Sequence, residues 1–119
     1  MSKLDVFFFD RPVARQIFDT VLQAIRSNGP AAIIVRKSQI AFQRRVNFAL
    51  VWIPEQYLHH PAAPLVLTLS LCERDPSPRW KQVVEVAAGR FTHHLELHSP
   101  ADVDAEVAAW LRSAWQAAG

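Results

Sequence analysis

The stretch that most constrains the fold is residues 36–52, RKSQIAFQRRVNFALVW. It predicts two short strands joined by a turn, with Lys37 at the entrance and Arg44 and Arg45 at the tip. Because side chains alternate between the faces of a strand, a three-residue turn at 43–45 predicts one wholly apolar face. The residues on that face are Ile40, Phe42, Val46, Phe48, Leu50 and Trp52. A hairpin of this kind is stable only when its apolar face is buried, so the rest of the chain must cover it.

Residues 13–25 predict a helix, because apolar residues recur there at helical spacing. Its expected buried face comprises Val13, Ile17, Phe18, Val21 and Ile25. Asp10 is a residue type that accepts N–H bonds at a helix start, and Pro12 fits a first turn. The run 28–30, Asn-Gly-Pro, predicts the end of this helix.

Four further strands are expected, at 31–35, 65–72, 80–87 and 91–98. Residues 65–72 alternate cleanly, with the leucines on the inner face. Residues 80–87 fit a helical stripe as well, but their valines favour a strand, followed by a hairpin turn at 88–89. In the last strand the residues on one face are Phe91, His93, Leu95 and Leu97.

The chain ends with a second predicted helix. Ser99 is placed to cap it, Pro100 fits the first position, and Asp102 lies three residues after the cap. Its expected buried stripe is Val103, Val107, Trp110, Leu111 and Ala114. The order predicts a single α+β domain over 1–119, with two layers: an antiparallel sheet of five to six strands packed by an N-terminal and a C-terminal helix.

Composition excludes several classes of protein. A chain of 119 residues, half of them hydrophobic, can bury a core without metal or disulfide cross-links. A single cysteine, Cys72, forms no internal disulfide, and no apolar run reaches the length of a membrane span. We therefore expect a cytoplasmic protein that does not bind membranes.

The net charge of +2 is unevenly distributed. Residues 20–54 contain basic residues and no acidic one, whereas residues 96–119 carry Glu96, Asp102, Asp104 and Glu106 against Arg112. A basic hairpin and an acidic C-terminal helix could attract different partners, or each other, within one chain or between two chains of a homodimer.

Several runs, FFFDRP, KSQIAF, RRVNFA, THHLEL and SPADVDAEVAAWLRSAW, resemble a small bacterial domain family of unknown function, found alone or appended to other domains. The residues that match its pattern are Phe8, Pro12, Lys37, Ile40, Phe42, Phe48, Ala49, His93 and Asp104. The chain departs from it with Trp115 where tyrosine is expected and His94 where arginine is common. The resemblance implies a one-domain fold and no particular activity.

Lys37, Arg44 and Arg45 are the main ligand-binding prediction, because guanidinium groups bind phosphate and carboxylate with forked donors. The leading hypothesis is a non-enzymatic binding module that uses this basic hairpin on an anionic ligand or an acidic protein patch. Aromatic residues interleave with these cations, so weak nucleic-acid binding is a further option. The acidic C-terminal helix argues against a tight complex with nucleic acid.

His93 is the remaining site prediction. A histidine on an apolar strand face is most often a core residue with its ring nitrogens paired. The alternative hypothesis is a small enzyme, with His93 as acid–base and Lys37 or Arg45 as electrostatic stabilisers. Were Lys37 beside His93, its charge and partial burial would lower the pKa of the imidazole.

Neither a metal nor a cofactor is expected. His94 and His98 lie four residues apart on a strand, about 13 Å by the usual rise, which is too far for one ion. His59 and His60 fall in a loop with no evident third ligand. The chain also lacks a glycine-rich phosphate loop and a nucleophile motif.

Overall fold

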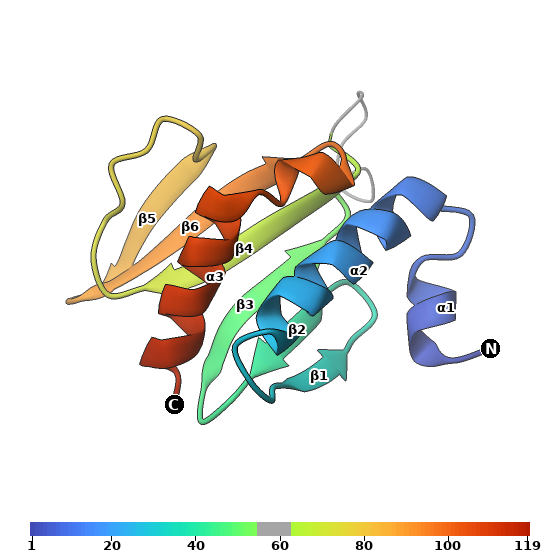
Figure 1. The fold of residues 1–119 in the computed structure, drawn as a ribbon, viewed down its shortest axis with the longest axis horizontal. Coiled ribbons are helices and arrows are strands. Elements are labelled where there is room, and N and C mark those ends of the chain that lie inside the picture. Colours follow the sequence, from blue (N-terminus) through green and yellow to red (C-terminus); the bar gives the residue numbers. More distant parts are fainter. Residues whose placement is uncertain (55–62) are drawn as a thin grey trace.

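Among the described residues, six antiparallel strands form one sheet in the order β1-β2-β3-β4-β6-β5 (Figure 1). The structure, a computed structural model, describes residues 1–54 and 63–119. The strands are β1 (Ala32–Val35), β2 (Ile40–Gln43), β3 (Asn47–Trp52), β4 (Leu65–Leu71), β5 (Gln82–Ala87) and β6 (Arg90–Leu97). The helices are α1 (Lys3–Phe7), α2 (Pro12–Arg26) and α3 (Ala105–Ala117), with a 3-10 turn, η2 (Pro100–Asp102), before α3.

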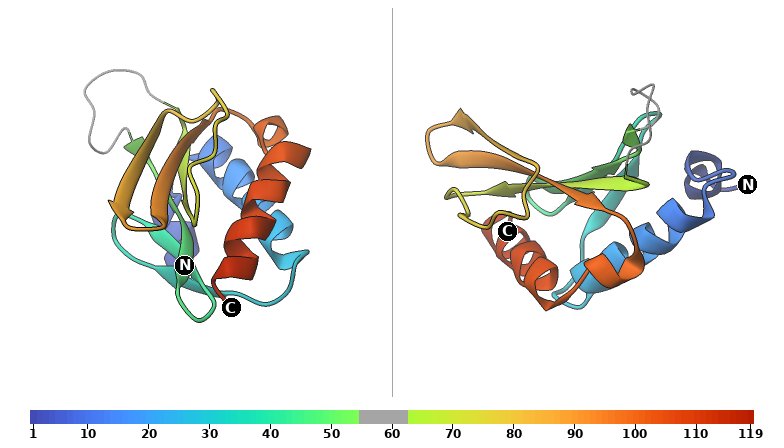
Figure 2. Two further views of the ribbon diagram at one scale, coloured as in Figure 1. Left: turned by 90° about the vertical axis from the view of Figure 1, so that its left-hand side faces the viewer. Right: turned by 90° about the horizontal axis from the view of Figure 1, so that it is seen from above.

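Helices α2 and α3 lie side by side on one face of the sheet (Figure 2). Directly paired residues on neighbouring strands share a face, so the register identifies the residues on each side. One row on the helix-covered face is Ile33, Phe42, Ala49, Leu69, His93 and Val83. The buried core lies between this face and the two helices. The predicted α+β class, with an antiparallel sheet and packing helices at both ends of the chain, is therefore confirmed.

The opposite side of the sheet is covered by no helix of the described chain, and we call it the open face (Figure 2). Its central row, by the same register, is Ile34, Ala41, Leu50, Thr68, His94 and Gln82. None of these side chains belongs to the core cluster. Two side chains on the open face, those of Ala41 and Thr68, are nevertheless buried.

A bulge in β3 overturns part of the predicted hairpin pattern. Phe42 pairs with Ala49 while Gln43 pairs with Asn47, so Phe48 is an extra residue in β3. Such an insertion moves all later side chains of the strand to the other face. Phe48 and Ala49 consequently both join the core. The predicted inward placement of Leu50 and Trp52 is wrong, since both lie on the open face, and Val46 is exposed.

The first predicted helix is present as α2, with two differences. Asp10 does not cap it: the residue has a positive φ of 58°, and Arg11 occupies the cap position, where its side chain does not cap the helix. Val13 is exposed, and Ala14 takes its place on the buried face. The chain also forms α1, which the sequence reading did not include; Ser2 and Asp5 form a reciprocal capping box at its start.

The last helix begins later than predicted. Residues 100–102 form the 3-10 turn, and the side chain of Asp104 accepts from the Val107 N–H as the cap of α3. Ser99 makes no such bond, and the Asp102 carboxylate accepts from the His98 N–H instead. The predicted strand at residues 80–87 is confirmed in substance, because β5 covers Gln82–Ala87 and turns at Gly89 into β6.

We expect Trp110→Ala to lower the free energy of unfolding by about 3–5 kcal/mol, the usual cost of removing a large buried aromatic side chain. Trp110 is 8% exposed and its ring lies 4.1 Å from that of Trp80. Urea denaturation measures the loss. Trp110→Phe, which keeps a ring but removes the indole N–H, is the matched control and should lose less. An unchanged midpoint in Trp110→Ala would contradict this packing.

Candidate functional site

Lys37 lies in the turn between β1 and β2, and its side chain is exposed. The Arg36 N–H donates to the Gln39 carbonyl over 2.9 Å and closes this turn. Within the part of the chain that the structure describes, Lys37 forms no ion pair. The ammonium is therefore presented to solvent at one end of β2.

Arg44 and Arg45 lie at the other end of β2, in the turn to β3. The guanidinium of Arg44 lies 3.6 Å from the centre of the Trp115 ring and donates to the Trp115 carbonyl over 2.8 Å. The backbone N–H of Arg45 donates to the Ala118 carbonyl over 2.9 Å, while its side chain is exposed. Arg44 is thus occupied at the C-terminal end of α3, and Arg45 is open to solvent.

The four predicted ligand-binding residues do not converge on one pocket of the described chain. Lys37 and Arg44 are separated by the length of β2, about 13 Å for four residues. His93 lies on β6, three strands away from β2, or about 14 Å.

His93 is fully buried on the core face and both of its ring nitrogens have partners. Nε2 accepts from the Asp75 N–H over 3.0 Å, which leaves Nδ1 to donate to the Phe91 carbonyl at 3.3 Å. Burial lowers the pKa of His93; the Asp75 carboxylate opposes this shift, and Arg74 adds to it. The lowering anticipated from Lys37 therefore has another cause. This placement favours the interpretation of His93 as a core residue.

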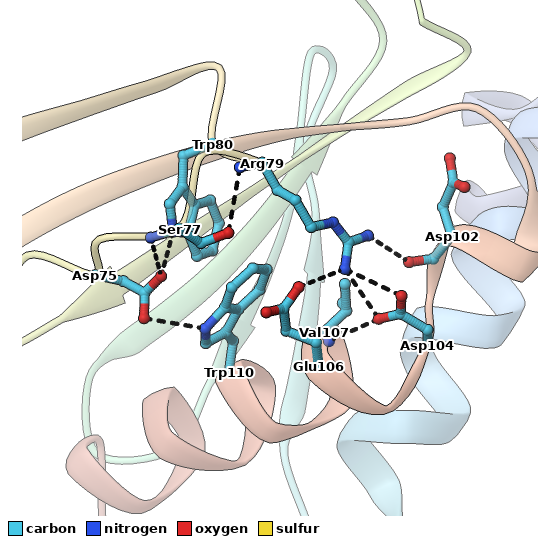
Figure 3. A network of polar contacts seen from close by, with 9 residues as sticks. All are labelled: Asp75, Ser77, Arg79, Trp80, Asp102, Asp104, Glu106, Val107 and Trp110. Atoms are coloured by element: carbon cyan, nitrogen blue, oxygen red, sulfur yellow. Dashed lines mark hydrogen bonds and ion pairs between the residues drawn. The ribbon is translucent and has the colours of Figure 1, made fainter.

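Asp75 joins the segment before β5 to α3, an arrangement that the sequence reading missed (Figure 3). One carboxylate oxygen accepts from the Trp80 indole over 2.8 Å and from the Ser77 N–H over 3.0 Å. The other oxygen accepts from the Trp110 indole over 3.2 Å. Partial burial alone would raise the pKa of Asp75, but these N–H donors outweigh burial and hold the pKa below its usual value.

Arg79 anchors the same segment to the start of α3 (Figure 3). It donates to the carboxylates of Asp104 and Glu106 over 3.0 and 2.8 Å, and to the Asp102 carbonyl over 3.2 Å. The first turns of α3 are thus neutralised by Arg79 rather than by the basic hairpin. The charges and prolines of residues 73–79 marked this segment in the sequence, but they did not indicate that it contacts α3.

A hollow of about 420 Å³ opens at the end of the sheet beside the β2–β3 turn. We call it the Arg90 hollow. Its lining residues are Val46, Asn47, Phe48, Ser70, Leu71, Cys72, Gly89, Arg90, Ala114, Ala117 and Ala118. Among the described residues, this lining includes one cation, Arg90, and no carboxylate. Arg45 directly precedes the lining residue Val46, and its backbone N–H donates to the lining residue Ala118.

A second hollow, of about 400 Å³, lies on the open face. We call it the His94 hollow. It is lined by Ser38, Gln39, Leu50, Trp52, Thr68, Thr92 and His94. The Trp52 indole donates to the Thr68 hydroxyl over 3.1 Å, and that hydroxyl lies 2.8 Å from Nδ1 of His94. Because the sequence pattern placed Trp52 on the buried face, it did not indicate this cluster.

Two general features of the described residues bear on function. No group of three or more His, Cys, Asp or Glu side chains within residues 1–54 and 63–119 is placed to hold a metal ion. His59 and His60 lie outside the described residues. No described helix is both long and apolar enough to cross a membrane.

The fold and these hollows define a small α+β domain with helices on one face of an antiparallel sheet. The chain belongs to the family described as "Domain of unknown function (DUF5655)", whose sequence model matches residues 5–118. The predicted resemblance to a family of unknown function is thereby confirmed. Comparison with curated proteins found no match, and comparison with solved structures found none.

We expect Arg44→Ala to destabilise the fold and Arg45→Ala to leave it unchanged. Loss of the stack on Trp115 and of the bond to its carbonyl should cost about 1–2 kcal/mol. The adjacent arginine is a matched control because its side chain is exposed. Thermal unfolding of both variants measures the difference. Equal losses would contradict the structural role of Arg44.

We expect the domain to lose stability as the pH falls below about 6.5, the ordinary pKa of histidine. Burial lowers the folded-state pKa of His93, so the unfolded chain binds protons at a higher pH than the folded one. Each unit of difference between the unfolded-state and folded-state pKa values adds about 1.4 kcal/mol to the free energy of unfolding. This contribution is present above the unfolded-state pKa and is lost as the pH falls toward the folded-state pKa.

The measurement is the free energy of unfolding at pH 7.5 and 5.0 in the parent and in His93→Gln. Glutamine supplies an acceptor for the Asp75 N–H but does not titrate in this range. The pH dependence should become shallower in the variant. His94, whose pKa burial also lowers, accounts for part of what remains. The same slope in both proteins would refute the contribution of His93.

Proposed function

We propose that this domain is a non-enzymatic binding module that takes an anionic ligand in the Arg90 hollow through the β2–β3 turn. The observation that carries the proposal is the electrostatic character of that hollow. Arg90 lines it, the exposed Arg45 directly precedes the lining residue Val46, and no described acidic residue lines it. Neither arginine forms an ion pair with a described residue, so both guanidinium groups are available to a ligand.

The walls of the hollow define the rest of the ligand. Ala114 and Ala117 of α3 form one side, and Val46, which is 54% exposed, lies on the turn. Apolar walls with a few charged donors are typical of sites for small organic ligands. The arrangement therefore suits a phosphate or carboxylate attached to a short apolar body.

The contact of the turn with α3 supports a preorganised site. The Arg45 and Val46 N–H groups both donate to the Ala118 carbonyl, over 2.9 and 3.4 Å. Arg44, stacked on Trp115, offsets the negative end of the α3 dipole, which would otherwise repel an anion. Of the three cations predicted in the hairpin, Arg45 is thus the one suited to direct contact with a ligand, with Arg44 supporting the turn.

The enzyme alternative receives less support from the geometry. It requires His93, Lys37 and Arg45 around one substrate. His93 has 0% exposure and two hydrogen-bonded nitrogens, and the cations lie at opposite ends of β2. A binding module needs no such convergence.

The wider partner predictions stay open. A homodimer formed by the basic hairpin and α3 would have to use acidic groups that Arg79 already contacts. Weak nucleic-acid binding and a cytoplasmic location also stay predictions. Sedimentation of the purified domain and its affinity for a single-stranded oligonucleotide would address the first two.

The test of the proposed function is an NMR titration with hexyl phosphate and with inorganic phosphate. Hexyl phosphate should bind more tightly, because its chain covers the alanine wall, and should shift the amide signals of residues 45–47 and 89–90. Arg45→Ala and Arg90→Ala should each weaken binding about three- to tenfold, the usual effect of losing one charge-assisted hydrogen bond.

Arg36→Ala is the matched control, because it removes an exposed arginine from the turn at the far end of β2. Its affinity for hexyl phosphate should equal that of the parent. An equal loss in Arg36→Ala, or shifts spread over the whole surface, would indicate nonspecific charge attraction and reject the site.

A further inference from the structure

We propose that the His94 hollow is a second, separate binding site, and that it takes a small planar aromatic carboxylate. The proposal rests on a hydrogen-bonded chain across three strands, an unused donor at the end of that chain, and a cation in the turn that borders the hollow. It is independent of the Arg90 hollow and of every residue that lines it.

The chain of hydrogen bonds fixes the geometry of the site. Leu50, Thr68 and His94 are direct neighbours on β3, β4 and β6, and Trp52 lies two residues further along β3. Thr68 is 7% exposed and bonds to both aromatic partners, at 3.1 Å to the indole and 2.8 Å to the imidazole. Two rings on the open face of the sheet are therefore held in defined orientations.

The same chain selects the tautomer of His94. An indole N–H only donates, so the Thr68 oxygen is the acceptor in its bond with Trp52. The hydroxyl proton of Thr68 is then best used on Nδ1 of His94, which leaves the imidazole proton on Nε2. Burial lowers the pKa of His94, with His93 contributing, which keeps the ring neutral at pH 7. Nε2–H bonds to no described residue, so it is a donor available to a ligand.

The charge in the turn that borders the hollow favours an anionic acceptor. Ser38 and Gln39 line the hollow, and Lys37 immediately precedes them in the same exposed turn. Gln39 adjoins Ile40, whose partner is Val51, so this turn lies beside the Trp52 end of β3. Glu96 of β6 also lies on this face, and Lys81 pairs with it over 3.3 Å. None of the described acidic residues lines the hollow.

The apolar part of the ligand follows from Leu50 and Trp52. An indole ring and a leucine side chain favour a flat apolar body. A carboxylate on that body can accept from the His94 imidazole, and the Lys37 ammonium, in the turn that includes the lining residue Ser38, adds a longer-range electrostatic attraction. A ring with one carboxylate fits within about 400 Å³.

The test is a titration of the full chain with benzoate, followed by the signals of the Trp52 indole, the Thr68 amide and the His94 ring. Benzoate should shift these three groups saturably. Acetate, which lacks the ring, and benzyl alcohol, which lacks the charge, should both bind more weakly. Nitrogen shifts of the imidazole should show Nε2 protonated and Nδ1 unprotonated at pH 7. The opposite tautomer would overturn the proposal.

Lys37→Ala should weaken benzoate binding about two- to fivefold, as expected for an exposed ion pair, and leave benzyl alcohol unaffected. Lys3→Ala, which removes an exposed lysine from α1, is the matched control and should bind like the parent. His94→Phe, which keeps a flat ring but no donor, should also lose affinity. Because Lys37 is exposed, its variant stays informative even if His94→Phe fails to fold.

The two proposed binding sites can be rejected independently of each other. Arg45→Ala should leave benzoate binding unchanged, and Lys37→Ala should leave hexyl phosphate binding unchanged. Shifts of the three reporter groups that do not saturate, or equal affinities for benzoate and benzyl alcohol, would reject the His94 hollow as a carboxylate site. They would leave the Arg90 hollow untouched.

Discussion

The anchoring of α3 at both of its ends is the constraint on which the rest of the structure depends. Arg79 contacts carboxylates at the first turns, and Arg44 stacks on Trp115 and bonds to its carbonyl near the last turn. Each arginine comes from a different connection, one before β5 and one between β2 and β3. Together they set the helix over the sheet, and the Arg90 hollow forms where its last turns meet the strand ends.

The regular part of the fold follows from local patterns in the sequence. Alternating leucines identify β4 and its inner face, and apolar spacing identifies α2 and the buried side of α3, because burial of one face dominates the stability of such elements. The first residue of each helix could not be predicted from these patterns. Asp10 and Ser99 are good capping types, but Arg11 and Asp104 occupy the cap positions, since contacts elsewhere in the fold decide which turn begins the helix.

The candidate sites were harder to predict, because each depends on residues distant in sequence. Arg44 and Arg45 are alike in the sequence, and only the position of Trp115 separates a structural arginine from an exposed one. His93 and His94 are adjacent, yet strand alternation buries the first in the core and places the second on the open face. His94, which departs from the family pattern, is the one of the pair with a ring nitrogen that bonds to no described residue.

The bulge at Phe48 shows how much can depend on the length of one strand. With one residue more in β3 than in the facing segment of β2, Phe48 and Ala49 enter the core while Leu50 and Trp52 face outward. The same six-residue segment thereby contributes to the interior and to a surface hollow. Insertions and deletions at this point are consequently a different class of change from substitutions, since a single one would exchange the interior and exterior surfaces of the strand. A relative with such a change would have a β3 of similar composition, but its side chains would face the opposite sides of the sheet.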